Sequence, residues 1–187
     1  MRILDLFSGT GSATAPFADA GWEVERVDIL GGIDARDYHP AGVYDFIWAS
    51  PPCTAFSVAG IHAHHFIGGL PFTDAAFLGL ELLQHTRRII SESGSRFFVI
   101  ENPRGLMRRM DEVADLERVT ITYCQYGDSR MKPTDLWGGF PPKFVPRSPC
   151  ARGNSHPGST QGRSGAAARG RVPYALGHDL LLSLESP

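Results

Sequence analysis

The chain has 187 residues, of which 42% are hydrophobic and 20% charged, and its formal net charge is −2. These values fit one globular domain with a sizeable core. No apolar run approaches the roughly 18 residues of a membrane span, so we expect no membrane association. Three widely spaced cysteines and an N-terminus that reaches an acid early disfavour a disulfide framework and a signal peptide, and favour the cytoplasm.

The charge is unevenly distributed along the chain. Between Leu136 and His178 there is no Asp or Glu, whereas six basic residues give a local charge of +6: Lys143, Arg147, Arg152, Arg163, Arg169 and Arg171. Such a segment could follow a phosphate backbone, because each cation that meets a phosphate releases a counterion. It could equally be a solvated, flexible loop, and composition alone does not separate the two.

The remaining sequence alternates between strand-like and helical patterns. Short apolar or alternating runs predict strands over 3–7, 22–28, 44–49, 96–100 and 119–123. Helices are predicted over 13–20, with a late start because of Pro16, from a cap at Thr73 or Asp74 to Gly94, and after Pro173. The second helix carries its apolar residues at Phe77, Leu80, Leu83 and Ile90. This alternation predicts an α/β fold, a Rossmann-like, doubly wound and mostly parallel sheet.

Three regions follow from these patterns. Residues 1–137 form the predicted core, and residues 138–170, rich in Gly, Pro and Arg, form a short irregular basic lobe. Residues 171–187 form a helix that returns to the core. In doubly wound sheets ligands bind beyond the carboxyl ends of the strands, so polar residues that follow strand-like runs are expected to share one site.

The first such motif is the loop Phe7-Ser8-Gly9-Thr10-Gly11. Its glycines permit close approach of the backbone to a ligand, and the next helix offers free N–H groups. Asp28 ends the second predicted strand and could accept hydrogen bonds from ribose hydroxyls, and Asp34 could accept one from an adenine amino group. The loop alone could be an ordinary turn, whereas the loop and the acid together favour a nucleoside-bearing cofactor.

The second motif is Pro51-Pro52-Cys53, which stiffens a strand end and projects a thiol. A free cysteine is more often a small buried hydrophobe than a nucleophile, and a nucleophile needs a partner acid. Glu101 follows four apolar residues in another strand-like run and could be that partner, or could cap the next turn.

In this order the motifs resemble those of the DNA cytosine-C5 methyltransferase family, of the class I S-adenosylmethionine-dependent methyltransferases, from Asp5 to Trp137. The chain looks like the compact, bacteriophage-encoded members. The resemblance implies the catalytic residues Cys53, Glu101 and Arg130. It implies a cofactor site for S-adenosylmethionine at Phe7, Gly9, Thr10, Gly11, Asp28, Ile29, Asp34 and Pro51. It implies substrate-binding residues Ser57, Asn102, Arg104 and Lys132.

The sequence also departs from the family pattern. Thr54 stands where Gln is frequent, Pro103 replaces Val, and Arg130, Lys132 and Thr134 replace the Gln and two Arg of a later motif. The resemblance implies that Cys53 adds to cytosine C6, that Glu101 serves N3, and that the base is flipped out of double-stranded DNA. We expect residues 54–71 to form a lid with possible hinges at Gly60, Gly68 and Gly69.

The lobe of about thirty residues offers few base-reading side chains, so we expect a recognition site of roughly two to four base pairs. A monomer is the expected state. Two other functions stay open from the motifs: a tRNA or RNA cytosine-C5 methyltransferase, and a non-catalytic nucleic-acid-binding module, which the presence of both Cys53 and Glu101 disfavours. Amino-group methyltransferases are disfavoured, because their motif ends in an aromatic residue rather than a thiol.

Metal binding is the remaining alternative. Cys124, Cys150 and His156 could supply three zinc ligands and so fix a glycine-rich lobe. No pair among them has the short Cys-x-x-Cys spacing, so the sequence favours a chain without a metal site.

Overall fold

The structure is a computed structural model that describes residues 1–58, 63–152, 155–157 and 165–185. Its strands are β1 (Arg2–Leu6), β2 (Glu23–Val27), β3 (Phe46–Ala49), β4 (Phe66–Ile67), β5 (Leu70–Pro71), β6 (Phe98–Pro103), β7 (Glu117–Thr122) and β8 (Pro133–Gly139). Its α-helices are α1 (Ala15–Asp19), α2 (Asp74–Ser93), α3 (Ala166–Gly170) and α4 (Tyr174–Glu185). Short 3₁₀ turns include η1 (Ile29–Gly31), η3 (Leu106–Arg109), η4 (Asp111–Val113) and η5 (Tyr123–Tyr126).

Six of the strands form one sheet in the order β2-β1-β3-β6-β8-β7. The strands β2, β1, β3 and β6 are parallel, and β8 runs antiparallel to both of its neighbours. Strand order therefore reverses between β1 and β3, which is the switch point where doubly wound folds bind ligands. The predicted mostly parallel, doubly wound sheet is confirmed.

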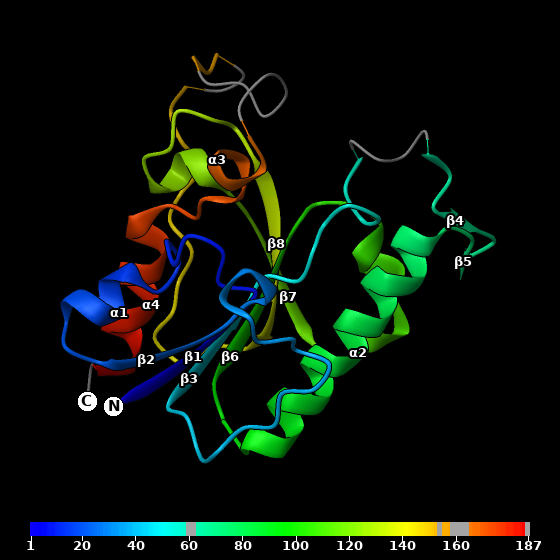
Figure 1. The fold of residues 1–187 in the computed structure, drawn as a ribbon. Helices are drawn as coiled ribbons and strands as arrows, with labels where there is room; N and C mark the ends of the chain where they lie inside the picture. The colour runs from blue at the N-terminus through cyan, green and yellow to red at the C-terminus, as the bar shows by residue number, and fades with distance from the viewer. Residues whose placement is uncertain (59–62, 153–154, 158–164, 186–187) are drawn as a thin grey trace.

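Helices cover both faces of this sheet, as Figure 1 shows, with α1 and α4 on one face and α2 on the other. None of the helices in the described part of the chain is long and apolar enough to cross a membrane. Helix α1 begins after Thr14 with Pro16 in its first turn, as predicted. Helix α2 is capped by Thr73, whose side chain accepts from the Ala76 N–H at 3.3 Å, and it ends at Gly94 with φ of 63°.

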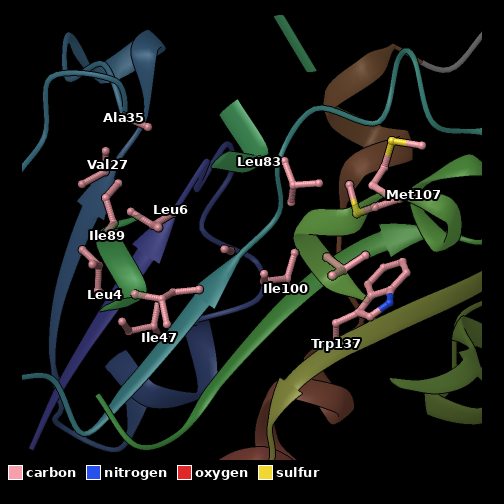
Figure 2. Close-up of a cluster of buried hydrophobic side chains, with 14 of the residues drawn as sticks. Leu4, Leu6, Val27, Ala35, Ile47, Leu83, Ile89, Ile100, Met107 and Trp137 are labelled. Atoms are coloured by element: carbon pink, nitrogen blue, oxygen red, sulfur yellow. The ribbon is translucent and has the colours of Figure 1, made fainter. Parts of the chain in front are cut away.

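Two hydrophobic clusters follow from the alternation of side chains along each strand. On the α2 face, Leu4, Leu6, Ile47 and Ile100 pack with residues of the helix such as Leu83, in the cluster drawn in Figure 2. On the opposite face the intervening residues pack against α1 and α4: Ile3, Phe46, Trp48, Val99, Phe17, Leu176 and Leu180. Each central strand is thus apolar on both sides, which explains its continuous apolar sequence.

Several details differ from the sequence-based expectations. Phe77 is 56% exposed, because Ala76, Leu82 and Ile89 supply the buried face of α2 together with Leu83. Strand β6 does not end before Glu101 but continues through Pro103. The segment 54–71 contains the hairpin β4–β5, in which Gly68 and Gly69 form the turn with positive φ, and the proposed hinge at Gly60 lies outside the described residues.

Strand β8 was not predicted. The expected boundary between core and lobe, at residue 137, falls inside this strand and therefore inside the sheet. A Cβ at Gly138 would lie 2.0 Å from the carbonyl oxygen of Phe98 on the neighbouring strand, so only glycine fits there. The two glycines that suggested an irregular lobe therefore belong to the core. The segment between β8 and α4 has little regular structure among its described residues apart from α3, and its yellow-to-orange trace rises from the lower half of the view to the top in Figure 1.

Candidate active site

The fold brings the predicted site residues to one edge of the sheet. The carboxyl ends of the parallel strands β1, β2, β3 and β6 point to the same edge, so the residues that follow them meet there. Strand β7 also runs in this direction, because it is antiparallel to β8. Its end, and the start of β8 at Pro133, therefore add Tyr123 and Lys132 to the same edge.

The glycine loop after β1 is held by the acid that follows β2. Asp28 accepts the N–H of Gly9 at 2.8 Å with one carboxylate oxygen and the N–H of Leu30 at 2.9 Å with the other. Gly9 and Gly11 have positive φ, and so does Phe7, at 59°, where a side chain is rarely found. Thr10 is exposed at the tip of the loop. The structure thus joins the loop and Asp28 in one unit, as the sequence predicted.

A cleft of about 370 Å³ opens beside this unit. Four predicted cofactor residues line it: Phe7, Asp28, Ile29 and Asp34. Further lining residues, which sequence reasoning missed, are Ile33, Ala35, Arg36, Ser50, Pro52, Leu78 and Leu82. Pro52 lines the cleft in place of the predicted Pro51, whose side chain is buried.

Asp34 is paired with Arg36. The guanidinium donates to the carboxylate at 2.6 Å, and this pairing lowers the pKa of Asp34 to about 2. The carboxylate is therefore ionised at neutral pH and acts only as a hydrogen-bond acceptor. That is the role that the sequence predicted for it toward an amino group.

Cys53, which follows β3, and Glu101, which lies in β6, interact electrostatically. Burial raises the pKa of the Cys53 thiol, and the negative charge of Glu101 raises it further, whereas Lys132 and Arg169 act in the opposite direction. Glu101 is 5% exposed. A buried carboxylate requires partners, and it has two in this structure.

These partners are Tyr123 and Lys132. The Tyr123 hydroxyl donates to Glu101 at 2.9 Å, and the Lys132 ammonium lies 3.8 Å from the same carboxylate oxygen. Lys132 also lies over the Tyr123 ring, 4.5 Å from its centroid. Lys132 was predicted as a substrate-binding residue, whereas Tyr123 was not singled out, because a tyrosine at a strand end carries no distinctive pattern.

Asn102 and Ser57 fix the loop that carries Cys53. The fully buried Asn102 side-chain amide donates to the carbonyl of Pro51 at 2.8 Å. Ser57 forms an isolated antiparallel bridge with Gly105. A Cβ added at Gly105 would lie 2.1 Å from the carbonyl oxygen of Phe56, so the two backbones approach closely here. The structure therefore places both predicted substrate-binding residues where they can hold the loop in position.

Arg130 has a different environment from the one expected of a catalytic residue. Its guanidinium pairs with Asp128 at 2.5 Å and donates to the carbonyls of Ala168, Arg169 and Arg171. It joins the segment between η5 and β8 to the end of α3, and among the described residues no hydrogen bond or ion pair links it to Cys53 or Glu101. Arg104, predicted to contact substrate, is exposed. Within the basic lobe, Arg147 is paired with Asp179 at 2.6 Å, so its charge is offset.

The three candidate metal ligands also come together. Cys124, Cys150 and His156 offer ligand atoms that all lie within 4.8 Å of one another. Spacing along the chain gave no sign of this arrangement, because Cys124 and Cys150 are 26 residues apart and β8 lies between them.

Comparisons with known proteins bear on this site. A protein-family model described as C-5 cytosine-specific DNA methylase matches residues 26–122. A protein of Frog virus 3 (isolate Goorha), named "Probable DNA (cytosine-5)-methyltransferase", is 32% identical over 194 residues, which cover 91% of this chain and 89% of the viral protein.

Two solved structures match with a TM-score of 0.50. One is a prophage-encoded E. coli protein described as a DNA modification methyltransferase, at 20% identity over 74% of this chain and 46% of that chain. The other is the methyltransferase EhMeth of Entamoeba histolytica, at 12% identity over 76% and 54%. At such identities the likeness shows the fold alone, and this chain spans about half the length of either structure.

The sheet order, the glycine loop and the cleft at the strand ends define a class I methyltransferase fold. Within that class, the family match and the viral relative are decisive. The chain belongs to the C-5 cytosine-specific DNA methylase family. The family and the enzyme class predicted from the sequence are thereby confirmed.

Proposed function

We propose that this protein transfers a methyl group from S-adenosylmethionine to C5 of a cytosine in double-stranded DNA, through a covalent bond between the Cys53 sulfur and C6 of the base. The observation that carries this proposal is that a thiol and a buried, hydrogen-bonded acid lie within electrostatic reach of each other, Cys53 after β3 and Glu101 in the neighbouring strand β6. Cytosine C6 is a weak electrophile, so a nucleophile needs an acid at N3 to drive addition.

The cleft suits S-adenosylmethionine in both its polar and its apolar groups. Each oxygen of Asp28 accepts one backbone N–H and keeps a lone pair for a ribose hydroxyl. Asp34 can accept from the adenine amino group. Ile29 and Ile33 are 66% and 42% exposed, and with Phe7 they provide an apolar surface for the adenine ring. When bound, the cofactor supplies the electrophilic methyl group.

The side chains of the protein manage the proton and the covalent bond. Protonated Glu101 donates its proton to N3 as the Cys53 thiolate forms its bond to C6. A neutral Glu101 also no longer repels the Cys53 thiolate. Protonation of Glu101 therefore supplies the acid for N3 and also favours the thiolate form of Cys53. After methylation, a water molecule takes the C5 proton, the electron pair of the C5–H bond restores the C5–C6 double bond, and the sulfur–C6 bond breaks to release Cys53 as a thiolate. N3 returns its proton to Glu101, which completes the cycle. Tyr123 and Lys132 hold the Glu101 side chain during these steps.

The substrate is proposed to be a flipped cytosine, since a base inside a duplex cannot reach a recessed thiol. Arg104, Arg152 and Arg171 are exposed, so their charges are available to phosphates. Arg147 is paired with Asp179, so its charge is offset. A lobe of about thirty residues offers few base-reading side chains, which supports a short recognition site of roughly two to four base pairs.

Covalent trapping tests the chemistry. A duplex containing 5-fluorocytosine, which cannot lose a C5 proton, should form a denaturation-resistant complex with the wild type in the presence of S-adenosylmethionine. Cys53→Ala should form none, while its affinity for the cofactor, measured by calorimetry, stays within a few-fold of wild type. Methyl transfer by Cys53→Ala would overturn the proposal.

The substrate is tested separately. Duplex DNA and tRNA of the same cytosine content are methylated side by side, and transfer to tRNA alone would reassign the substrate to RNA. Bisulfite sequencing of plasmid DNA from expressing cells then reads the target directly. A single long site would contradict the proposal of a short one.

A further inference from the structure

Three soft ligand groups meet where the basic lobe crosses η5. Cys124 lies in η5, and Cys150 and His156 come from the lobe. The sulfur atoms of Cys124 and Cys150 are 3.1 Å apart, and the sulfur of Cys150 is 3.2 Å from Nε2 of His156. Neither cysteine is in a disulfide. This cluster is distinct from the site of Cys53 and takes no part in the chemistry proposed above.

The distances fit a shared metal ion. Zinc binds thiolate sulfur at about 2.3 Å and imidazole nitrogen at about 2.0–2.1 Å, so tetrahedral ligand atoms lie roughly 3.5–3.8 Å apart. The sulfur–sulfur and sulfur–nitrogen separations of 3.1 and 3.2 Å are shorter than this, and the three ligand atoms all lie within 4.8 Å of one another. Side-chain rotations can bring atoms at these separations to one ion. Thiolates with an imidazole select zinc over magnesium or calcium, which prefer oxygen.

The surroundings of the cluster are polar. The Cys124 sulfhydryl donates to Thr122 Oγ1 at 3.3 Å, and Thr122 Oγ1 donates in turn to Gln125 Oε1 at 3.0 Å. Nδ1 of His156 is buried without a hydrogen-bond partner among the described residues, whereas Nε2 lies 3.2 Å from the Cys150 sulfur. The imidazole thus presents Nε2 to the cluster.

We propose that Cys124, Cys150 and His156 bind one zinc ion, with a water molecule as the fourth ligand, and that this ion fixes the lobe to η5. Among the described residues, the lobe is otherwise attached here through Arg147: Gln125 donates to its carbonyl at 2.5 Å, its N–H donates to the Tyr126 hydroxyl at 3.4 Å, and its guanidinium pairs with Asp179 at 2.6 Å. An ion held by Cys124 and Cys150, which are 26 positions apart, would add an attachment beyond Arg147.

The metal content of untagged protein tests this directly. Wild type purified without chelator should contain about one zinc per chain by mass spectrometry of the elements. Cys124→Ser, Cys150→Ser and His156→Ala should each lose most of it. Matched controls are Cys53→Ser and His178→Ala, which remove a cysteine and a histidine outside the cluster and should retain the zinc of the wild type.

Two further measurements keep the proposal falsifiable where a variant does not fold. Cobalt added to metal-free wild type should give the absorption of a tetrahedral ion with thiolate ligands. A zinc-selective chelator should lower the melting temperature of wild type, whereas a non-chelating isomer should not. Thiol titration separates the alternative: three free thiols in unfolded, metal-stripped wild type are expected, and one would show a disulfide between Cys124 and Cys150.

Wild type that contains no zinc and takes up neither zinc nor cobalt would overturn the proposal, as would the disulfide. None of these readouts depends on methyl transfer. A negative result here therefore leaves the proposed function standing, and failure of that function leaves this site standing.

Discussion

Asn102 is the residue through which strand β6 fixes the position of the Pro51-Pro52-Cys53 loop. It lies next to Glu101 on the same strand, and its side-chain amide donates to the Pro51 carbonyl at 2.8 Å in a fully buried environment. Replacing Asn102 with Ala removes this donor and leaves the carbonyl unpaired. The change should therefore loosen the thiol relative to the acid while leaving both groups present.

The expected loss of stability is modest. A buried acceptor without its partner costs about 1–3 kcal/mol. The Asn102 Oδ1 atom, however, is itself buried without a hydrogen-bond partner in the described structure, so its removal returns part of this free energy. We expect a net loss of about 1–2 kcal/mol and, for a chain of this size, a melting temperature lower by roughly 2–8 °C.

The loss of activity should be larger than the loss of stability suggests. A displacement of about 1 Å between reacting groups can reduce the rate about a hundredfold, so single-turnover methyl transfer by Asn102→Ala should fall by roughly tenfold to a hundredfold. Cofactor affinity should remain unchanged, since Asn102 does not line the cleft.

Ser93→Ala is the matched control for this experiment. Ser93 also donates to a backbone carbonyl in a buried site, at 2.7 Å to Ile90, but it lies at the end of α2 away from the loop. This variant should lose comparable stability and keep its rate. If both variants lose rate equally, or if Asn102→Ala keeps wild-type rate, Asn102 does not position Cys53.

Three further predictions follow from the same structure. Burial raises the pKa of Asp5 to about 7, so above about pH 4 the folded chain keeps a proton on Asp5 that the unfolded chain releases. The stability that depends on this proton is present below about pH 4 and is lost as the pH rises through 7. Asp5→Asn should remove this pH dependence, and at pH 8 its free energy of unfolding should exceed that of the wild type by up to about 4 kcal/mol, the equivalent of three pKa units. Urea unfolding that shows the same dependence of stability on pH in both proteins would refute this. Glu101→Gln removes the charge that raises the pKa of Cys53, so iodoacetamide should alkylate Cys53 at lower pH than in wild type, as followed on its peptide by mass spectrometry; an unchanged or opposite shift would contradict their coupling. Gly138→Ala should destabilise the sheet by about 3 kcal/mol or more, because its Cβ would overlap a carbonyl of β6, whereas Gly31→Ala, which meets no atom within 4 Å, should not; equal melting temperatures would contradict the close approach.

The central strands β1 and β3 could be predicted because they are buried on both faces, and such strands are nearly continuously apolar. The edge strand β2 could be predicted from its alternating pattern instead. Each of the three ends near a polar or glycine motif that marks the carboxyl edge. Helix α2 could also be predicted from the sequence, since Thr73 and Gly94 are standard capping residues at its two ends. The positions of Cys53 and Asp28 at one edge follow from this pattern alone.

Strand β8 could not be predicted, for two physical reasons. Its buried Asp135 interrupts the apolar pattern, and this charge is tolerated only because Arg108 pairs with it at 2.6 Å from a distant turn. Its last residues, Gly138 and Gly139, carry no side chain, because the neighbouring strand approaches too closely. Both features depend on tertiary contacts that spacing along the chain does not contain.

The missed strand also explains why Tyr123 was not expected beside Glu101. Because β8 is inserted between β6 and β7, the end of β7 comes to the edge where Glu101 lies, and Tyr123 follows directly after it. Lys132 precedes the start of β8 at the same edge. Without β8 the strand pattern places neither residue near Glu101, and Lys132 was expected at the site only through the family resemblance.

The four residues of η5 join the lobe to this chemistry. Tyr123 donates to Glu101, the proposed catalytic acid, Cys124 belongs to the proposed zinc site, and Gln125 and Tyr126 contact the backbone at Arg147. One short turn therefore contacts the acid on one side and the lobe on the other. The lobe is too small to form a core of its own. It need not be rigid by itself, because η5 sets its position relative to Glu101. Loosening the lobe should therefore reduce the rate of methyl transfer as well as the affinity for DNA, since the residues of η5 contact both the lobe and Glu101.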